Sequence, residues 1–127
     1  MPVIIDASAL LAFVFGEKGG EVVAPHIRGG TISAVNLSEV LIRMQEHSDD
    51  AMDIVSDILR LEVEIEAFTL DDSIAAAALR PLTKHLGLSF ADRACLALAQ
   101  RLDAPILTAD RDWAKLDLGL DIRQVRD

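Results

Sequence analysis

Aromatic residues and cysteine are scarce in this chain of 127 residues. Tyrosine is absent and there is a single tryptophan, so few side chains could stack on nucleic-acid bases. The lone Cys95 allows no internal disulfide, and its apolar neighbours predict a buried position. No apolar stretch approaches the ~20 residues that a membrane span needs, and the N-terminus lacks the basic segment of a signal peptide. These absences predict a cytoplasmic protein with no membrane segment.

Positive charge is also in short supply. The formal net charge is −9, which argues against a surface that coats nucleic acid in general. A local site that holds a divalent cation would still accept a phosphate, because the ion supplies positive charge only where it is bound. Hydrophobic residues make up 51% of the chain, enough for a folded core, and the length predicts one domain over residues 1–127.

Several common catalytic motifs are missing. No glycine-rich dinucleotide fingerprint or Walker-type loop occurs, which removes the usual nucleotide-binding functions. No Gly-x-Ser-x-Gly segment supports a serine hydrolase. The three histidines, His26, His47 and His85, lack the spacing of metal ligands and are expected in solvent.

Strand and helix patterns alternate along the chain, which predicts an α/β protein with a parallel sheet. Apolar or alternating runs indicate five short strands, at residues 3–5, 31–35, 63–68, 105–108 and 121–125. Helical periodicity lies between them, at residues 9–15, 21–27, 37–44, 54–61, 73–80 and 90–102. The helices at 37–44 and 54–61 are expected to form a hairpin whose apolar surface can take a partner.

Four carboxylates lie where a strand should end or a helix should begin: Asp6, Glu39, Asp92 and Asp110. The carboxyl ends of parallel strands share one edge of the sheet, and sites are built there. These acids are therefore expected to converge on one pocket. Because such a pocket would repel itself, the pattern indicates a bound divalent metal.

Each carboxylate also has a structural alternative as a helix cap. Asp6 can cap the helix that follows it. Glu39 can complete a capping box with Asn36, and Asp92 can complete one with Ser89. Capping and metal binding can coexist in one residue, since a helix N-terminus keeps a carboxylate ionised.

The last acid has neighbours with open roles. Asp110 can cap a helix at residues 111–116. Asp112 is a reserve metal ligand, but a surface acid in the first turn of that helix is the simpler interpretation. The hydroxyls of Ser8 and Thr108 are suited to orienting a carboxylate or a water, and both residues are equally ordinary in turns.

Taken in order, four segments resemble the PIN-domain ribonucleases, and most of all the VapC toxins of toxin–antitoxin pairs. The segments are Ile4-Ile5-Asp6-Ala7-Ser8-Ala9-Leu10, Ser33-Ala34-Val35-Asn36-Leu37-Ser38-Glu39-Val40, Leu88-Ser89-Phe90-Ala91-Asp92-Arg93-Ala94 and Ile106-Leu107-Thr108-Ala109-Asp110. The resemblance implies a three-layer α/β/α sandwich around the sheet, dependence on Mg²⁺ or Mn²⁺, and cleavage of RNA. It also implies a homodimer and a cognate antitoxin as protein partner.

The resemblance extends to individual site residues. Asp6, Asp92 and Asp110 match the aspartates that hold metal in the family, and Glu39 matches its motif glutamate. Ala7 departs from the hydroxyl residue that many relatives carry at this position, whereas Ser8 keeps the second hydroxyl. We hypothesise that Asp6 and Asp92 bind the metal directly and that Asp110 binds it directly or through water. Glu39 would then hold or deprotonate the attacking water.

Basic residues and competing functions complete the expectations. Arg43, Lys84, Arg93 and Arg111 are expected near the site, where they would contact RNA. One competing function is a receiver-like Mg²⁺-binding phosphoacceptor domain, but it needs a lysine directly after the last site strand, and none occurs before Lys115. The other is a catalytically inactive PIN-like module that only binds a partner.

Overall fold

The computed structural model describes residues 2–47 and 51–127, and within them five strands form one parallel sheet. The strands are β1 (Ile4–Ile5), β2 (Thr31–Ser33), β3 (Glu64–Glu66), β4 (Ile106–Thr108) and β5 (Ile122–Gln124). Their order is β3-β2-β1-β4-β5, and every neighbouring pair is parallel. The chain builds outward from β1 on one side and later returns to its other side at β4. The switch point of the topology therefore lies between β1 and β4.

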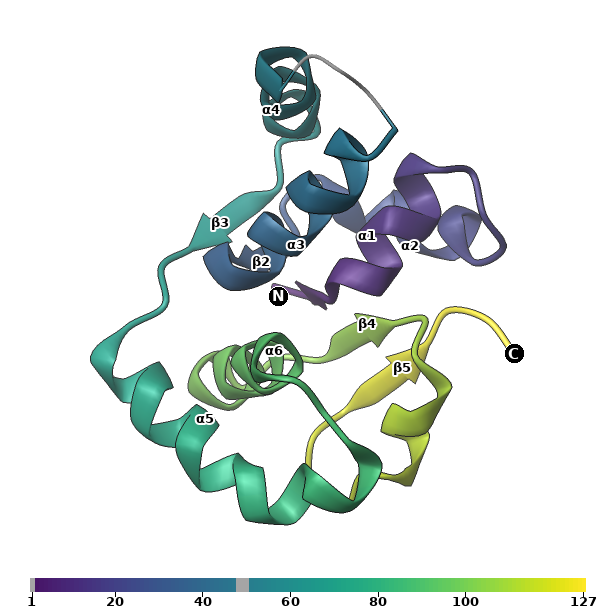
Figure 1. Cartoon of the computed structure of the whole chain (residues 1–127). Coiled ribbons are helices and arrows are strands. Elements are labelled where there is room, and N and C mark those ends of the chain that lie inside the picture. Colours follow the sequence, from purple (N-terminus) through teal and green to yellow (C-terminus); the bar gives the residue numbers. More distant parts are fainter. Residues whose placement is uncertain (1, 48–50) are drawn as a thin grey trace.

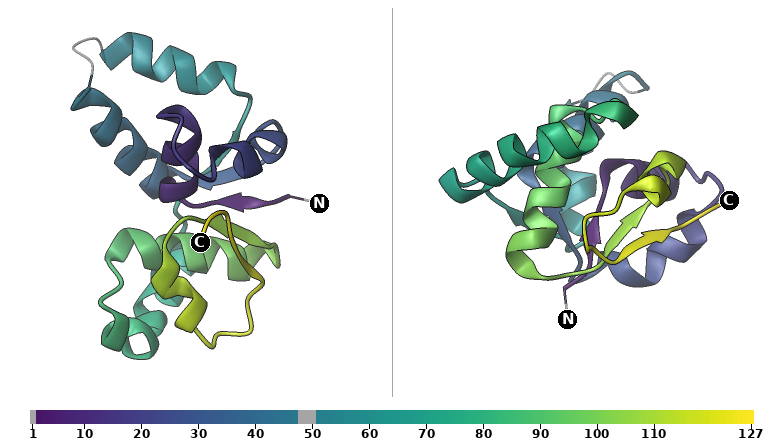
Figure 2. Two further views of the ribbon diagram at one scale, coloured as in Figure 1. Left: turned by 90° about the vertical axis from the view of Figure 1, so that its right-hand side faces the viewer. Right: turned by 90° about the horizontal axis from the view of Figure 1, so that it is seen from below.

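Helices cover both faces of this sheet (Figures 1 and 2). One layer holds α1 (Ala7–Val14), α2 (Gly20–Ile27), α3 (Ala34–Gln45) and α4 (Ala51–Arg60). The other holds α5 (Leu70–Thr83) and α6 (Phe90–Leu102), with the short 3₁₀ helices η1 (Lys84–Leu86) and η2 (Arg111–Lys115). The predicted three-layer α/β/α sandwich around about five parallel strands is confirmed.

The two central strands supply side chains to both layers. Ile5 and Leu107 point into the core under α1 to α4, whereas Ile4 and Ile106 point into the core under α5 and α6. All four are buried, which explains why these strands appear in the sequence as continuous apolar runs. Cys95 lies in the second core, as its apolar neighbours predict.

The start of α3 differs from the prediction. The strand expected at residues 31–35 ends at Ser33, whose hydroxyl accepts a hydrogen bond from the Val35 N–H at 3.2 Å and caps α3. Asn36 therefore lies inside the helix, and the predicted capping box of Asn36 with Glu39 is wrong. Ser33, and not Asn36, is the N-cap because it lies directly at the end of β2, where α3 can begin without an intervening turn.

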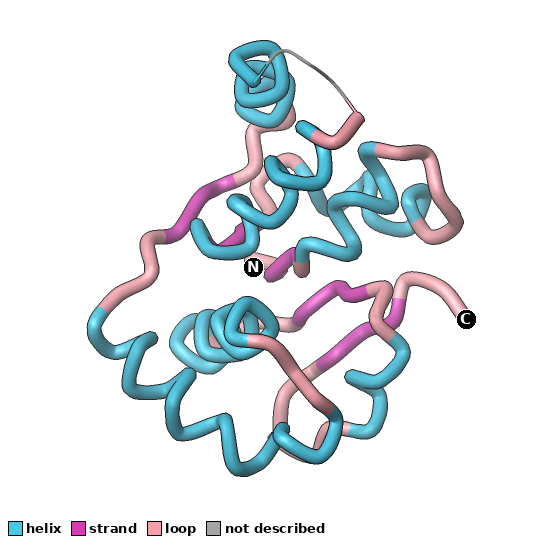
Figure 3. The backbone as a smooth tube through the Cα atoms, viewed as in Figure 1, coloured by secondary structure: helices cyan, strands magenta, loops and turns pink. Residues whose placement is uncertain are grey.

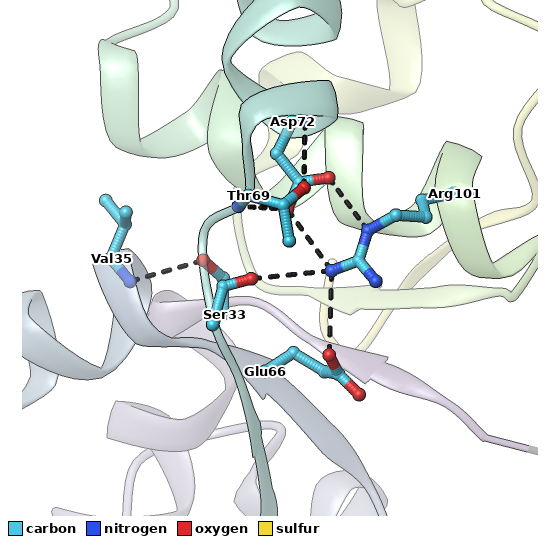
Figure 4. Close-up of polar contacts among 7 residues, drawn as sticks. Ser33, Val35, Glu66, Thr69, Asp72 and Arg101 are labelled. Carbon is cyan, nitrogen blue, oxygen red and sulfur yellow. Dashed lines mark hydrogen bonds and ion pairs between the residues drawn. The ribbon is translucent and has the colours of Figure 1, made fainter.

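The other helical layer is tied to the sheet edge by an ion-pair cluster (Figure 4). Thr69 and Asp72, which have the Thr-x-x-Asp spacing of a capping box, form a reciprocal box at the start of α5. Burial alone would raise the pKa of Asp72, but the hydrogen bonds and charge of Arg101 hold it below its ordinary value. Arg101 also reaches Glu66 of β3 at 3.6 Å, so one guanidinium joins β3, α5 and α6.

The helices α3 and α4 pack against each other as the predicted hairpin, with Ile54 and Ile58 buried on the inner face of α4. Residues 48–50 of their connection lie outside the described residues. Among the helices of the described residues, none is both long enough and apolar enough to cross a membrane.

Candidate active site

The strands β1, β4 and β5 are parallel neighbours (Figure 1; magenta in the same view in Figure 3), so their carboxyl ends lie at one edge of the sheet. A cavity of about 510 Å³ opens there. The four carboxylates singled out in the sequence all line it: Asp6, Glu39, Asp92 and Asp110. Four segments separated by up to about a hundred residues thus meet at the switch point of the sheet, where α/β folds place their ligands.

Asp6 is the most deeply placed of these acids, with 3% of its surface exposed. Its Oδ2 accepts hydrogen bonds from Ser8 Oγ at 2.6 Å and Thr108 Oγ1 at 2.9 Å, so both hydroxyls orient the carboxylate. Asp6 occupies the N-cap position of α1 but makes no capping hydrogen bond, which rules out the capping alternative. Burial raises its pKa to about 6 against the two hydroxyl bonds, and the charges of Asp92 and Glu39 add to the rise.

Glu39 is positioned by Asn36, the residue whose place in the sequence suggests a helix cap. The buried Asn36 donates from Nδ2 to Glu39 Oε1 at 3.0 Å and to the carbonyl oxygen of Ala91 at 2.9 Å. It therefore fixes Glu39 against the first turn of α6. Burial raises the pKa of Glu39, the bond from Asn36 lowers it, and the charge of Asp92 raises it further. The signal for this role is the Asn-x-x-Glu spacing, which places both side chains on one helix face.

Asp92 both caps α6 and lines the cavity. Its Oδ2 accepts from the Ser89 N–H at 2.9 Å, and its own N–H donates to Ser89 Oγ at 3.1 Å, the predicted capping box. The same carboxylate lines the cavity. Burial raises the pKa of Asp92 against the bonds from Ser89, and the charge of Asp110 raises it further while Arg93 lowers it.

Asp110 caps η2 and also faces the cavity. Its Oδ1 accepts from the Asp112 N–H at 3.0 Å, while its backbone carbonyl accepts from Gln124 Nε2 at 2.9 Å. Asp112 is exposed, pairs with Lys115 Nζ at 3.2 Å, and does not line the cavity. The reserve ligand therefore lies outside the candidate site.

Of the four basic residues expected near the site, only Arg43 lines the cavity. Arg93 reaches toward α5, where it donates to the carbonyl oxygen of Ala76, and it lies 6.0 Å from the centre of the Phe90 ring. Lys84 and Arg111 are exposed residues of η1 and η2 that do not line the cavity.

Two charged residues of the cavity were missed in the sequence: Glu17 and Arg126. Arg126 could have been found from its position just after the last strand, because Asp6 and Asp110 also come just after strands.

The donor set fits a hydrated divalent cation. Among the described residues, no three acidic, histidine or cysteine side chains are arranged to hold one metal ion between them. Mg²⁺ does not need such a cage, because it keeps several waters and binds proteins through one or two carboxylates. Burial and the charges of neighbouring carboxylates raise the pKa of Asp6, Glu39 and Asp92. A bound cation would offset both effects, because its positive charge stabilises the ionised carboxylates.

Comparisons with known proteins agree with this architecture. Over 98% of both chains, the structure matches a toxin–antitoxin complex from Klebsiella pneumoniae with a TM-score of 0.80 and 17% identity. A DNA-bound VapBC from Salmonella typhimurium matches over 98% of both chains with a TM-score of 0.73 and 16% identity. A sarcin–ricin-loop-cleaving VapC toxin from Mycobacterium tuberculosis matches with a TM-score of 0.72 and 16% identity, over 89% of this chain and 93% of that one.

At these identities the likeness shows the fold. No curated protein sequence matches the chain. The PIN domain family model matches residues 3–118, nearly the whole length of the sequence and all four carboxylates of the cavity. The chain therefore belongs to the PIN domain family.

Proposed function

We propose that this protein is a metal-dependent endoribonuclease that acts as the toxin of a toxin–antitoxin pair. The observation that carries the proposal is the convergence of Asp6, Glu39, Asp92 and Asp110 on one cavity at the switch point of the sheet. The structural neighbours named as toxins support it, and one of them is named for cleaving an RNA loop.

The metal would be Mg²⁺, with Mn²⁺ as a substitute, and Asp6, Asp92 and Asp110 would hold it. When bound, such an ion polarises a phosphate oxygen and lowers the pKa of a water. Asp6 Oδ2 is occupied by two hydroxyl donors, and within the described residues Oδ1 accepts no hydrogen bond. Ser8 and Thr108 thus leave one oxygen of Asp6 available as a ligand.

Glu39 is suited to the proton transfer. Its pKa is raised by burial, so it attracts a proton more strongly than an exposed glutamate does. Asn36 holds Oε1, which leaves the other oxygen to orient or deprotonate the attacking water. Glu39 would take the proton of the water as the water oxygen attacks phosphorus. The bond between phosphorus and the 3′ oxygen would break, and the 3′ oxygen would take a proton from solvent, which leaves a 3′-hydroxyl and a 5′-phosphate.

The same proposal specifies the partners. A cognate antitoxin would lay an amphipathic segment along the α3–α4 hairpin, where the exposed Ile42 also lines the cavity. A basic residue of that segment would bind the acids in place of the metal. The protein would act as a homodimer in the cytoplasm, on RNA.

Cleavage of a mixed RNA pool tests the proposal directly. We expect activity with Mg²⁺ or Mn²⁺, none with EDTA, and a loss of at least about 100-fold in an Asp6→Asn/Asp92→Asn double variant. The matched control is Asp112→Asn, the same chemical change outside the cavity, which should keep its activity. Full metal-dependent cleavage by the double variant would overturn the assignment of these acids.

The competing functions gain no support from the site. Lys115 pairs with Asp112, and no lysine of the described residues lines the cavity, so the receiver-like phosphoacceptor lacks its required cation. An inactive PIN-like module would not need all four acids in one cavity. Calorimetric titration with Mn²⁺ separates these cases if cleavage is absent, because a pure partner-binding module has no reason to bind the ion.

A further inference from the structure

The cavity has an unusual balance of charge for a site that must receive a polyanion. Glu17 adds a fifth carboxylate to the four acids, and only two cationic side chains of the described residues face them, Arg43 and Arg126. Arg43 is already paired with Glu46 at 3.5 Å. Arg126 forms no ion pair with any described residue, and its one hydrogen bond runs from Nη1 to the carbonyl oxygen of Lys18 at 3.1 Å.

The sheet fixes where Arg126 lies. Strands β4 and β5 pair in register with Thr108 opposite Gln124, and Asp110 and Arg126 each follow two residues later. The register is held beyond the strands, because the Val125 N–H donates to the Thr108 carbonyl and Gln124 Nε2 donates to the Asp110 carbonyl, both at 2.9 Å. Val125 is buried in the core. Arg126 is therefore delivered to the same edge as the acids by the sheet itself.

Gly19, in the connection between α1 and α2, packs closely against Val125 and the Cβ of Arg126. Gly19 has a φ of +97°, and a Cβ on it would lie 2.9 Å from the Val125 carbonyl oxygen and 3.3 Å from Arg126 Cβ. The absence of a side chain lets the α1–α2 connection close over this segment. With the Lys18 carbonyl as acceptor, the connection orients the guanidinium. The other four of its five N–H donors have no hydrogen-bond partner among the described residues.

We propose that Arg126 is a substrate-binding residue that contacts an RNA backbone phosphate flanking the scissile one. This inference rests on the proposed nuclease function. A guanidinium presents a rigid fork that fits two phosphate oxygens, and its charge does not depend on pH or on the metal. Because RNA must approach an edge lined by five carboxylates, a fixed unpaired cation there lowers the electrostatic barrier to binding.

Steady-state cleavage of a fluorescently labelled pool of short random-sequence RNA tests the assignment with Arg126→Gln. We expect KM to rise about tenfold and kcat to change less than about threefold. The slope of log KM against log salt concentration should fall by about one, the value for one lost phosphate contact. Arg126→Lys keeps the charge without the fork and should recover part of the KM. Arg123→Gln removes the same charge from β5, outside this cavity, and should match the parent protein.

A merely structural role gives a different pattern, in which Arg126→Gln lowers the melting temperature and kcat together and leaves the salt dependence unchanged. That result would overturn the inference while the nuclease stands. Fluorescence anisotropy with the same RNA in EDTA separates the two proposals. RNA binding that Arg126→Gln weakens and Arg123→Gln does not supports the assignment even without cleavage. Equal binding by all variants, or none by the parent protein, overturns it.

Discussion

At the scale of single residues, Asp6 sets the energetics of the site. It is a buried carboxylate whose pKa rises from 3.8 to about 6 in the folded protein, so folding favours its protonated form. Between those values the folded state binds more protons than the unfolded state, and stability falls as pH rises through this window. The cost at neutral pH is on the order of 3 kcal/mol. Glu39 and Asp92, whose pKa values are also raised, act in the same direction.

Replacement of Asp6 by Asn should therefore stabilise the metal-free protein at neutral pH while removing its activity. We expect the free energy of unfolding to decline less between about pH 4 and pH 7 in Asp6→Asn, by about 3 kcal/mol. Denaturant titrations in EDTA at several pH values measure this, with the exposed Asp112→Asn as control. Identical pH profiles for the parent protein and Asp6→Asn would contradict the assignment of this strain to Asp6.

The sequence located the acids but not the residues that orient them. Asp6 and Asp110 follow apolar runs that can only be buried strands, and parallel strands bring their ends together. The role of Asn36 depends on where α3 begins, and Ser33 decided that by a single capping bond. Arg93 stands beside Asp92 in the sequence yet points to Ala76, because adjacent residues of a helix lie about 100° apart.

At the scale of elements, the two capping boxes share a chemistry and differ in location. Thr69 with Asp72 starts α5 beside the ion pair with Arg101, whereas Ser89 with Asp92 starts α6 at the cavity. Both were visible in the sequence because the pattern is local. Only the fold distinguishes the cap that stabilises a helix from the cap that also prepares a site.

This pair allows a matched test. Thr69→Ala and Ser89→Ala should each lower the free energy of unfolding by about 1 kcal/mol. Only Ser89→Ala should weaken Mg²⁺ activation. It removes the side-chain hydrogen bond of Ser89, one of the two Ser89 contacts that lower the pKa of Asp92, and keeps the backbone N–H bond. Denaturant unfolding and cleavage rates across Mg²⁺ concentrations measure the two effects. Equal metal dependence in the two variants would argue against a ligand role for Asp92.

At the scale of the whole molecule, the outward face of α5 is apolar where solvent should favour polar residues. Leu70 and Ile74 are 76% and 62% exposed, and Ala77 and Pro81 continue the same helical stripe. Asp71 lies at one end of the helix and Arg80 toward the other. Two copies of α5 packed antiparallel about a two-fold axis would bury the stripe and bring opposite charges together.

The proposed homodimer can be tested on this face. We expect Ile74→Glu to shift the mass in solution from dimer to monomer, with unfolding of the monomer changed by less than about 0.5 kcal/mol because the side chain is exposed. Light scattering over a range of concentrations provides the mass. Val22→Glu, an exposed apolar position on α2, is the control and should remain dimeric. An unchanged mass for Ile74→Glu would place any dimer contact elsewhere.

The long sequence separation of the site residues has a consequence for synthesis. Three hydrogen bonds join these distant segments. Thr108 Oγ1 donates to Asp6, the Ala109 N–H donates to Ser8 Oγ, and Arg126 donates to the Lys18 carbonyl oxygen. A nascent chain that has not yet released residues 105–126 from the ribosome has β1 without β4 and acids without their partners. Contacts of such separation form late in folding. The proposed ribonuclease would therefore stay inert beside the RNA that encodes it until residues 105–126 have left the ribosome.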